Sequence, residues 1–356
     1  MFETTGDTGM EWRKALLPNN ATIEEAMASI NDSGLGIALI VDISLRLVGV
    51  VTDGDLRRAV LARRALSAPV LSVMNRTPVT VERGVPISVE DEQRFSKVRG
   101  HPIPIVTADN IVVGLLGVGV QVEAPRRDNW VLLMAGGFGT RLGELTKNCP
   151  KPMLKVGGRP ILELIIEQLI HHGFHKFYIS VHYLPEVIVN HFGDGSQMGV
   201  TIKYLYETQP LGTGGALGSV GQLDSKPILV MNCDLITRLD LNSLADFHEE
   251  QNNALTVCVR EYGFPVPFGV AEGHEGILHR LVEKPLQRFF VNAGIYVVNP
   301  ELVATCQPGK RIDMPDFINE LLAKGVKIGM FPVFETWLDV GRPDDFSLAQ
   351  SISVKA

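Results

Sequence analysis

The sequence predicts an α/β protein with a doubly wound, mostly parallel sheet, preceded by a smaller α+β domain. Short apolar runs at residues 131–135, 177–181 and 228–231 are typical of buried parallel strands. Helical segments of ten or more residues separate such strands in doubly wound folds. Before residue 125, paired apolar runs recur after 65 residues. For a chain of 356 residues we therefore expect two domains, residues 1–125 and 126–356.

The first domain opens with a predicted helix at residues 21–30. Thr22 is a candidate N-cap, Glu25 stands at the capping-box position, and Gly34 ends the helical pattern. Residues 35–42 and 45–52 form two apolar runs joined by a short polar link, which predicts a hairpin. A second amphipathic helix is expected at residues 56–65, and residues 122–129 are short and polar, as in a linker.

An internal repeat links the two halves of this domain. Residues 103–109 leading into 111–116 echo residues 38–42 leading into 47–51. The repeat, over about residues 15–122, resembles a tandem pair of CBS domains. In that family the pattern G-h-h-[TS]-x-x-D holds the phosphate and ribose of an adenosine nucleotide. The resemblance implies one regulatory nucleotide site in the first copy, at the three positions that match, namely Gly49, Thr52 and Asp55.

Two observations limit the interpretation of this repeat as a nucleotide-binding domain: the second copy lacks the matching residues, and those of the first copy can also be explained as helix caps. Gly117 and Val120 stand where the hydroxyl and carboxylate are expected, and a valine side chain cannot hydrogen-bond to ribose. Alternatively, the module serves dimer packing, and Thr52 and Asp55 cap the helix that follows. Both interpretations remain open from the sequence alone.

Composition restricts the partners and the compartment. A formal net charge of −7 gives no reason to expect nucleic acid or an anionic membrane as a partner. The 4 cysteines form no C-x-x-C pair, which favours reduced thiols in a cytosol. No signal peptide is visible, and no apolar run reaches the roughly 18 residues of a spanning helix. We expect a cytoplasmic protein.

A glycine-rich loop follows the strand at residues 131–135. Gly136, Gly137 and Gly139 let the backbone lie close to a ligand and point N–H groups at phosphate oxygens, and Arg141 and Lys151 add positive charge. The spacing matches neither Walker A nor the G-x-G-x-x-G dinucleotide motif. The loop is interpreted as a polyphosphate cradle, with an incidental strand-to-helix turn as the alternative.

Further motifs follow in order. A second glycine-rich turn, residues 207–216, opens a predicted helix that starts at Thr213 or Gly214 and ends at Gly221. The turn offers backbone donors and acceptors to a planar base, with a helix-opening turn that binds no ligand as the alternative. Asp234 follows a buried strand and Asp339 lies in W-L-D-V-G; two carboxylates can hold one Mg²⁺ against a phosphate, although each could equally be a turn residue. V-E-K-P at residues 282–285 and V-N-A-G-I-Y at residues 291–296 complete the set.

Together the five motifs, over about residues 129–350, resemble the sugar-1-phosphate nucleotidylyltransferases. The resemblance implies a Rossmann-like nucleotidyltransferase fold, Mg²⁺ as the cofactor, and NTP and a sugar 1-phosphate as the partners. By motif match, the catalytic residues would be Arg141, Lys151, Asp234 and Lys284, and the metal ligands Asp234 and Asp339. Nucleotide contacts would come from Ala135, Gly136, Gly137, Gly139, Thr140, Arg141, Glu207, Pro210, Gly212 and Thr213, and sugar contacts from Glu283, Lys284, Asn292 and Gly294.

The resemblance implies nucleotidyl transfer with release of pyrophosphate. A carboxylate at Glu207 suits the adjacent N–H donors of guanine, which favours GTP. CBS domains ahead of the catalytic domain resemble the branch that includes glucosamine-1-phosphate guanylyltransferases of legionaminic acid synthesis, and a homo-oligomer is expected. Alternatives are a mannose- or heptose-1-phosphate guanylyltransferase, a thymidylyl-, uridylyl- or cytidylyltransferase, or a non-catalytic nucleotide-sensing regulatory protein.

Overall fold

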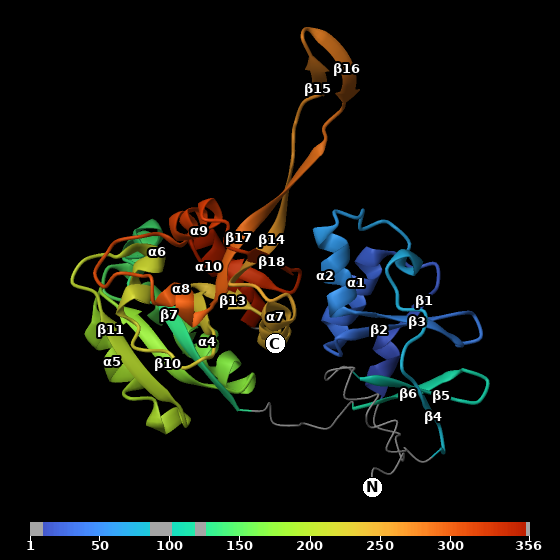
Figure 1. Ribbon diagram of the computed structural model, residues 1–356, viewed down its shortest axis with the longest axis horizontal. Helices are drawn as coiled ribbons and strands as arrows, with labels where there is room; N and C mark the ends of the chain where they lie inside the picture. The colour runs from blue at the N-terminus through green and yellow to red at the C-terminus, as the bar shows by residue number, and fades with distance from the viewer. Residues whose placement is uncertain (1–9, 86–101, 118–125, 354–356) are drawn as a thin grey trace. The chain divides into compact units, whose positions relative to one another are not determined.

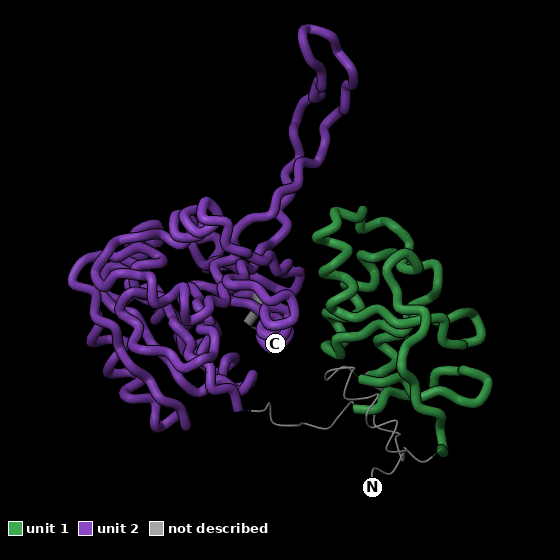
Figure 2. The backbone as a smooth tube through the Cα atoms, viewed as in Figure 1, with its two compact units in different colours: residues 1–122 green, residues 123–356 purple. Residues whose placement is uncertain are grey.

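The structure is a computed structural model that describes residues 10–85, 102–117 and 126–353. It divides into two compact units, Met1–Val122 and Glu123–Ala356 (Figure 2). Each unit is described by itself below. In the described part of the chain, no helix combines the length and apolar character needed to cross a membrane.

The helices of unit 1 begin at capping boxes. Helix α1, Ile23–Ser33, starts after Thr22, whose hydroxyl accepts the Glu25 N–H at 3.2 Å while the Glu25 carboxylate accepts the Thr22 N–H at 2.7 Å. The predicted helix start is confirmed, and Gly34 ends the helix with φ of 65°. Helix α2, Asp53–Leu61, begins earlier than predicted because its own capping box lies at Thr52, and it also ends earlier, with Ala62 as its C-cap.

Two small sheets in unit 1 share one topology. One contains β1 (Leu16–Pro18), β2 (Ile37–Val41) and β3 (Leu47–Thr52), and the other contains β4 (Val81–Glu82), β5 (Ile103–Val106) and β6 (Val112–Leu116). In each, the first strand runs parallel to the second and the second antiparallel to the third. Both hairpins carry a register shift, at Ile40/Val41 and at Ile105/Val106. The predicted hairpin and internal repeat are therefore visible in the backbone; Val120 of the second copy lies outside the described residues.

The two sheets of unit 1 are joined. The N–H of Leu47 donates to Asn110 O at 2.9 Å, and the N–H of Val112 donates to Leu45 O at 3.0 Å. One hydrophobic cluster includes buried residues of both sheets, among them Leu39, Val106 and Leu115. Short 3-10 turns, η1 (Met10–Ala15) and η2 (Val70–Ser72), complete the described elements.

Unit 2 is built on a seven-stranded sheet in the order β11-β10-β7-β12-β17-β14-β18. Strand β17 runs antiparallel to both of its neighbours, and the other neighbouring strands are parallel. The predicted mostly parallel sheet is thus confirmed. The strands are β7 (Arg127–Met134), β10 (Phe174–Val181), β11 (Thr201–Tyr206), β12 (Ile228–Asn232), β14 (Leu255–Pro265), β17 (Leu286–Val298) and β18 (Ile328–Val333).

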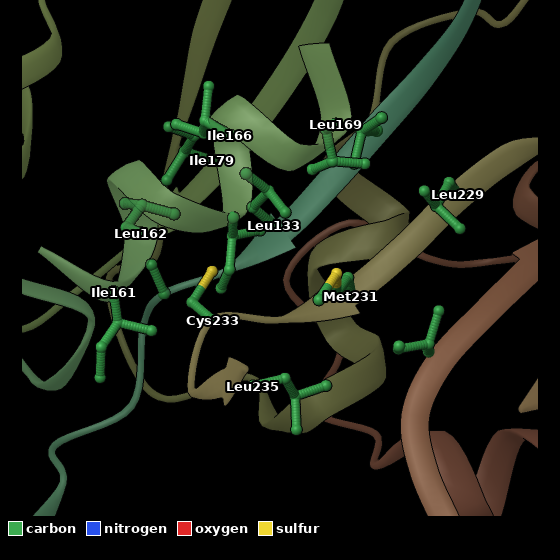
Figure 3. Close-up of a cluster of buried hydrophobic side chains, with 14 of the residues drawn as sticks. Leu133, Ile161, Leu162, Ile166, Leu169, Ile179, Leu229, Met231, Cys233 and Leu235 are labelled. Atoms are coloured by element: carbon green, nitrogen blue, oxygen red, sulfur yellow. The ribbon is translucent and has the colours of Figure 1, made fainter. Parts of the chain in front are cut away.

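Helices cover both faces of this sheet. Because strand side chains alternate between faces, Leu133 packs into one core cluster and Leu132 into another. The first cluster, shown in Figure 3, includes side chains from α4 (Ile161–His171), α5 (Pro185–Phe192) and α7 (Leu241–Glu250). The second includes residues of α8 (Pro300–Val303) and α9 (Met314–Ala323). The short elements β8 (Lys155–Val156), β9 (Arg159–Pro160) and η6 (Ser196–Met198) and the helix α10 (Pro343–Ser353) also belong to this unit.

Two local predictions in unit 2 are wrong. Residues 127–129, expected in a linker, belong to β7. The helix expected after the second glycine-rich turn is only the short α6 (Gly212–Gly215) followed by the 3-10 turn η7 (Ala216–Ser219). A Cβ at Gly218 would lie 2.4 Å from Gln307 O, so this glycine allows close packing against another segment.

A hairpin arm, residues 261–290, extends from the sheet (Figure 1). β14 and β17 pair along the arm, but β18 accompanies β14 only as far as Arg260, and β12 accompanies β17 only from Ile295. Strands β15 (Val270–His274) and β16 (Ile277–Val282) form its tip. Large apolar side chains are exposed on this arm, including Tyr262, Phe264, Phe268 and Phe289.

Candidate active site

A pocket of about 230 Å³ lies at the carboxyl ends of β7 and β12. Ligands bind at this edge in open parallel sheets. Residues from both glycine-rich segments and from the two strand ends line it, namely Met134, Ala135, Gly136, Gly137, Lys151, Pro152, Glu207, Pro210, Gly212, Thr213, Asn232, Cys233, Asp234 and Asp313. Most of the predicted nucleotide-binding residues are therefore brought together at one place.

The first glycine loop allows Lys151 to approach the pocket. Gly139 has φ of 65° and precedes the 3-10 turn η4, Thr140–Thr146. A Cβ at Gly139 would lie 2.9 Å from Thr146 Cγ2 and 3.0 Å from Lys151 Cβ. The Thr146 hydroxyl donates to Gly139 O at 3.0 Å. Gly139 thus fixes the loop against the short 3-10 turn η5, Lys151–Met153.

The two predicted metal ligands are neighbours. Strand β13 (Leu235–Thr237) pairs with β19 (Trp337–Asp339), with Leu235 opposite Asp339. The Lys151 ammonium forms an ion pair with Asp234 and lies 3.8 Å from Asp339 Oδ1. Lys151 is only 9% exposed, so this cation is held between two carboxylates with little access to water.

Three buried oxygen atoms of this region make no hydrogen bond with any described residue. In the described part of the chain, the Oδ1 atoms of Asn232, Asp234 and Asp339 are buried and have no hydrogen-bond partner. Burial raises the pKa of Asp339, and the nearby charge of Asp234 raises it further, while Lys151 and Arg141 oppose the shift. An unpaired buried carboxylate oxygen is unfavourable unless a cation or a donor meets it.

The donor set fits Mg²⁺. Within the described residues there is no cluster of three or more His, Cys, Asp or Glu side chains able to hold a metal. Mg²⁺ is usually held by one or two carboxylates together with substrate phosphates, and it does not need such a cluster. The Oδ1 atoms of Asp234 and Asp339, which make no hydrogen bond in the described part of the chain, meet that requirement. The adjacent thiol of Cys233 is buried, which raises its pKa and leaves it unsuited to metal binding.

Arg141 lies at the same site, although it does not line the pocket. A Cβ built on Gly341 would lie 3.2 Å from Asp339 Oδ1 and 3.7 Å from an Arg141 guanidinium nitrogen. The guanidinium is therefore close to the Asp339 carboxylate. Thr140, also predicted to bind nucleotide, is exposed and is absent from the lining.

Glu207 connects the two glycine-rich segments. The Ser180 hydroxyl donates to Oε1, and the Leu211 N–H donates to Oε2 at 3.0 Å. A Cβ at Gly136 would lie 3.1 Å from Glu207 Oε1. Both carboxylate oxygens are thus used within the chain, and Glu207 braces the loops in addition to lining the pocket.

The predicted sugar-binding residues separate into two groups. Gly294 has φ of 73°, and a Cβ there would lie 2.6 Å from Asn232 Nδ2. Asn292 Oδ1 accepts the Gly294 N–H at 3.0 Å, at the irregularity in the pairing of β17 with β14, so Gly294 lies within β17 against the pocket-lining Asn232. Glu283 and Lys284 instead lie in the hairpin arm between β16 and β17, and neither lines the pocket.

The predicted regulatory residues of unit 1 have local partners. Asp55 Oδ2 accepts the Thr52 N–H at 2.9 Å and the Thr52 hydroxyl at 2.7 Å. A Cβ at Gly49 would lie 2.6 Å from Asn75 O, which the Val50 N–H meets at 3.0 Å. This geometry agrees with helix capping, and an adenosine-nucleotide site remains a prediction.

Three side chains at the site were not identified from the sequence: Ser180, Asn232 and Asp313. Ser180 lies within β10 and is completely buried. Asn232 ends β12, immediately before the predicted aspartate. Asp313 precedes Met314-Pro315 at the start of α9, a pattern that indicates an N-cap and gives no sign of a ligand.

Comparisons with known proteins agree with the geometry of unit 2. A family model described as nucleotidyl transferase matches residues 130–354. A mannose-1-phosphate guanyltransferase of Debaryomyces hansenii is 33% identical over 224 residues, which cover 60% of this chain and 62% of that protein. A mannose-1-phosphate guanylyltransferase of Mycobacterium tuberculosis is 33% identical over 223 residues, with coverage of 60% and 62%. The chain thus spans less than two thirds of the length of these curated relatives.

Two solved structures share the fold. A putative glucose-1-phosphate thymidylyltransferase from Bacillus anthracis has a TM-score of 0.51 at 23% identity, covering 64% of this chain and 95% of that chain. HddC from Yersinia pseudotuberculosis has a TM-score of 0.50 at 23% identity, covering 63% of this chain and 99% of that chain.

Proposed function

Because the chain belongs to the nucleotidyl transferase family, we propose that it transfers a nucleotidyl group from an NTP to a sugar 1-phosphate and releases pyrophosphate. The observation that carries this proposal is the cluster of Lys151, Asp234 and Asp339 beside the first glycine loop. In this cluster Lys151 supplies a positive charge, and Asp234 and Asp339 supply carboxylate oxygens that make no hydrogen bond with the described residues. The adjacent glycine loop is suited to phosphate binding.

The reaction needs positioning and charge neutralisation more than covalent help from the protein. An oxygen of the sugar phosphate attacks the α-phosphorus in line and forms a new P–O bond, while the bond to the β-phosphate oxygen breaks. Pyrophosphate leaves with that electron pair. A phosphate monoester is already ionised near neutral pH, so the attacking oxygen requires no general base.

The chain's own residues supply the stabilising charge. The N–H groups of the glycine loop and Arg141 would hold the β- and γ-phosphates and neutralise the leaving pyrophosphate. Lys151 would neutralise charge on the reacting phosphates. Asp234 and Asp339 would hold Mg²⁺, which supplies Lewis-acid neutralisation of phosphate oxygens when bound. Lys284 would meet the sugar phosphate only if the arm brought it to the pocket.

GTP is the proposed nucleotide, supported by the names of the relatives at 33% identity. For the sugar we propose glucosamine 1-phosphate, on the domain order of the chain, with mannose 1-phosphate as the second candidate, supported by those same names. An adenosine nucleotide at the first copy of the unit 1 repeat is the proposed regulator, and a homo-oligomer the proposed assembly.

The test is a matrix of GTP, ATP, UTP, CTP and dTTP against glucosamine, mannose, glucose and heptose 1-phosphates, read as pyrophosphate release with and without AMP. We expect one NTP to dominate and Asp234→Asn to abolish the signal. If the folded protein binds GTP but no combination releases pyrophosphate, the chain is instead a nucleotide sensor. Removal of Mg²⁺ by chelation should stop the reaction, and its return should restore it.

A further inference from the structure

Asp313 brings a third acidic side chain to the pocket, besides Glu207 and Asp234. It lies at the start of α9 and lines the pocket with Gly212 and Thr213, although it belongs to none of the five sequence motifs. Gly212 makes this approach sterically feasible, because a Cβ there would lie 2.6 Å from Asp313 Oδ1.

One oxygen of Asp313 is fixed by the chain. Oδ1 accepts the Thr213 N–H at 3.0 Å, and the Thr213 hydroxyl in turn accepts the Met314 N–H at 2.9 Å. These bonds hold the carboxylate in a defined orientation. Within the described residues, no hydrogen bond or ion pair involves Oδ2 of Asp313.

The other acidic residues of the pocket lining are already engaged. Glu207 uses both carboxylate oxygens, for Ser180 and for Leu211. Asp234 forms an ion pair with Lys151. Asp234 Oδ1 makes no hydrogen bond with the described residues, but that oxygen is assigned above to Mg²⁺. Within the described lining, Asp313 is therefore the carboxylate that combines a fixed orientation with an oxygen left for an organic substrate.

We propose that Asp313 is a specificity-determining residue that accepts a hydrogen bond from an N–H group of a substrate. The inference rests on the proposed nucleotidyl transfer. An oriented carboxylate suits either the paired N–H donors of guanine or the amino group of an amino sugar, and it disfavours a substrate that presents only acceptors. Glu207, which the sequence assigned to base recognition, then acts mainly as a brace between the loops.

Asp313→Asn is the sharpest variant, because asparagine retains Oδ1 for Thr213 and replaces only Oδ2 with an amide donor. We measure kcat and KM for GTP and ITP, which lacks the 2-amino group, and for glucosamine 1-phosphate and glucose 1-phosphate. If Asp313 reads the base, the preference for GTP over ITP falls about ten- to a hundredfold. If it reads the sugar, the preference for glucosamine 1-phosphate falls by a similar factor.

Asp316→Asn is the matched control, because Asp316 is exposed on the first turn of the same helix and does not line the pocket. It should leave both preferences unchanged. If kcat/KM in Asp313→Asn fell equally for all four substrates, or did not fall for any of them, the proposal would be overturned. The wild-type protein offers a test without any variant: activity that prefers neither GTP over ITP nor glucosamine 1-phosphate over glucose 1-phosphate also refutes it. Absence of activity with every substrate pair instead contradicts the proposed function.

Discussion

The N–H of Val340 donates a hydrogen bond to Asp234 O at 2.9 Å. This bond continues the pairing of β13 and β19 and places the Asp339 carboxylate beside that of Asp234. Main-chain pairing therefore fixes the separation of the two backbone positions from which the proposed metal ligands extend.

Asp339→Asn should separate stability from activity. The substitution removes one of two neighbouring carboxylate charges, so we expect a Tm equal to or above that of the wild type. Turnover should fall by about 10²–10³, the typical loss for a transition-state electrostatic group. Stabilisation by Mg²⁺ plus GTP, measured by calorimetry, should disappear. Asp344→Asn, at an exposed position nearby, should retain it. Persistent Mg²⁺ stabilisation in Asp339→Asn would exclude Asp339 as a ligand.

Arg141→Ala should lower kcat by about 10²–10³ with little change in Tm, because the side chain is exposed and would act on developing charge. Pyrophosphate release measures the effect. Arg238→Ala removes an exposed arginine that does not line the pocket and serves as the control. If the two variants had equal activity, Arg141 would have no role in holding the phosphates.

Gly139→Ala and Gly137→Ala form a matched pair within one loop. At Gly139 the positive φ and the contacts with Thr146 and Lys151 both oppose a methyl group. We therefore expect Gly139→Ala to lower the free energy of unfolding by about 1–3 kcal/mol. At Gly137 nothing lies within 4 Å of the added Cβ, and the ligand-free Tm should hardly change. Denaturant unfolding of both variants measures their free energies of unfolding. Equal stability would show that the loop can shift without cost.

His248 predicts an acid-sensitive core in unit 2. The ring is 2% exposed, with Nδ1 at 2.8 Å from Thr256 Oγ1 and Nε2 at 2.9 Å from Asn299 Oδ1. Burial lowers its pKa, although Asn299 and Glu249 oppose this shift. Between the lowered pKa and the ordinary value of about 6.5, the unfolded chain binds more protons, so stability falls as the pH falls through that range.

Urea unfolding at pH 7.5 and 5.5 tests this expectation for His248. His248→Gln keeps a polar side chain that does not titrate, and its stability should fall less over the same interval. Each kcal/mol of difference corresponds to about 2–4 °C in Tm for a domain of this size. The exposed His171→Gln provides the control and should behave as the wild type does. If the stability of the wild type and that of His248→Gln depended on pH in the same way, His248 would not be the cause of the acid sensitivity.

Local patterns predicted the first glycine loop, its preceding strand and the capping of α1, because a few adjacent residues determine each of them. They also predicted that the loop and Asp234 lie at one edge of a parallel sheet, since strand direction alone implies it. The roles assigned to the site residues remain predictions.

Long-range packing explains what the sequence left out. Nothing around Asp313 indicates that Gly212 will lie against it, because the contact joins segments far apart in the chain. The apolar runs of the sequence do not predict the hairpin arm either, because apolar and polar residues do not alternate regularly along β15 and β16. The motif containing Glu283 and Lys284 was placed at the sugar by family resemblance, whereas its position depends on how the arm bends.

The β13–β19 pair also has a consequence for biosynthesis. During translation, the ribosome completes β12 and Asp234 well before it adds Asp339. Until then the ion pair of Asp234 and Lys151 lacks the second carboxylate, and a chain that ends before Asp339 carries only one of the two proposed metal ligands. We expect such a chain to lose the proposed binding of Mg²⁺ even where its sheet has folded.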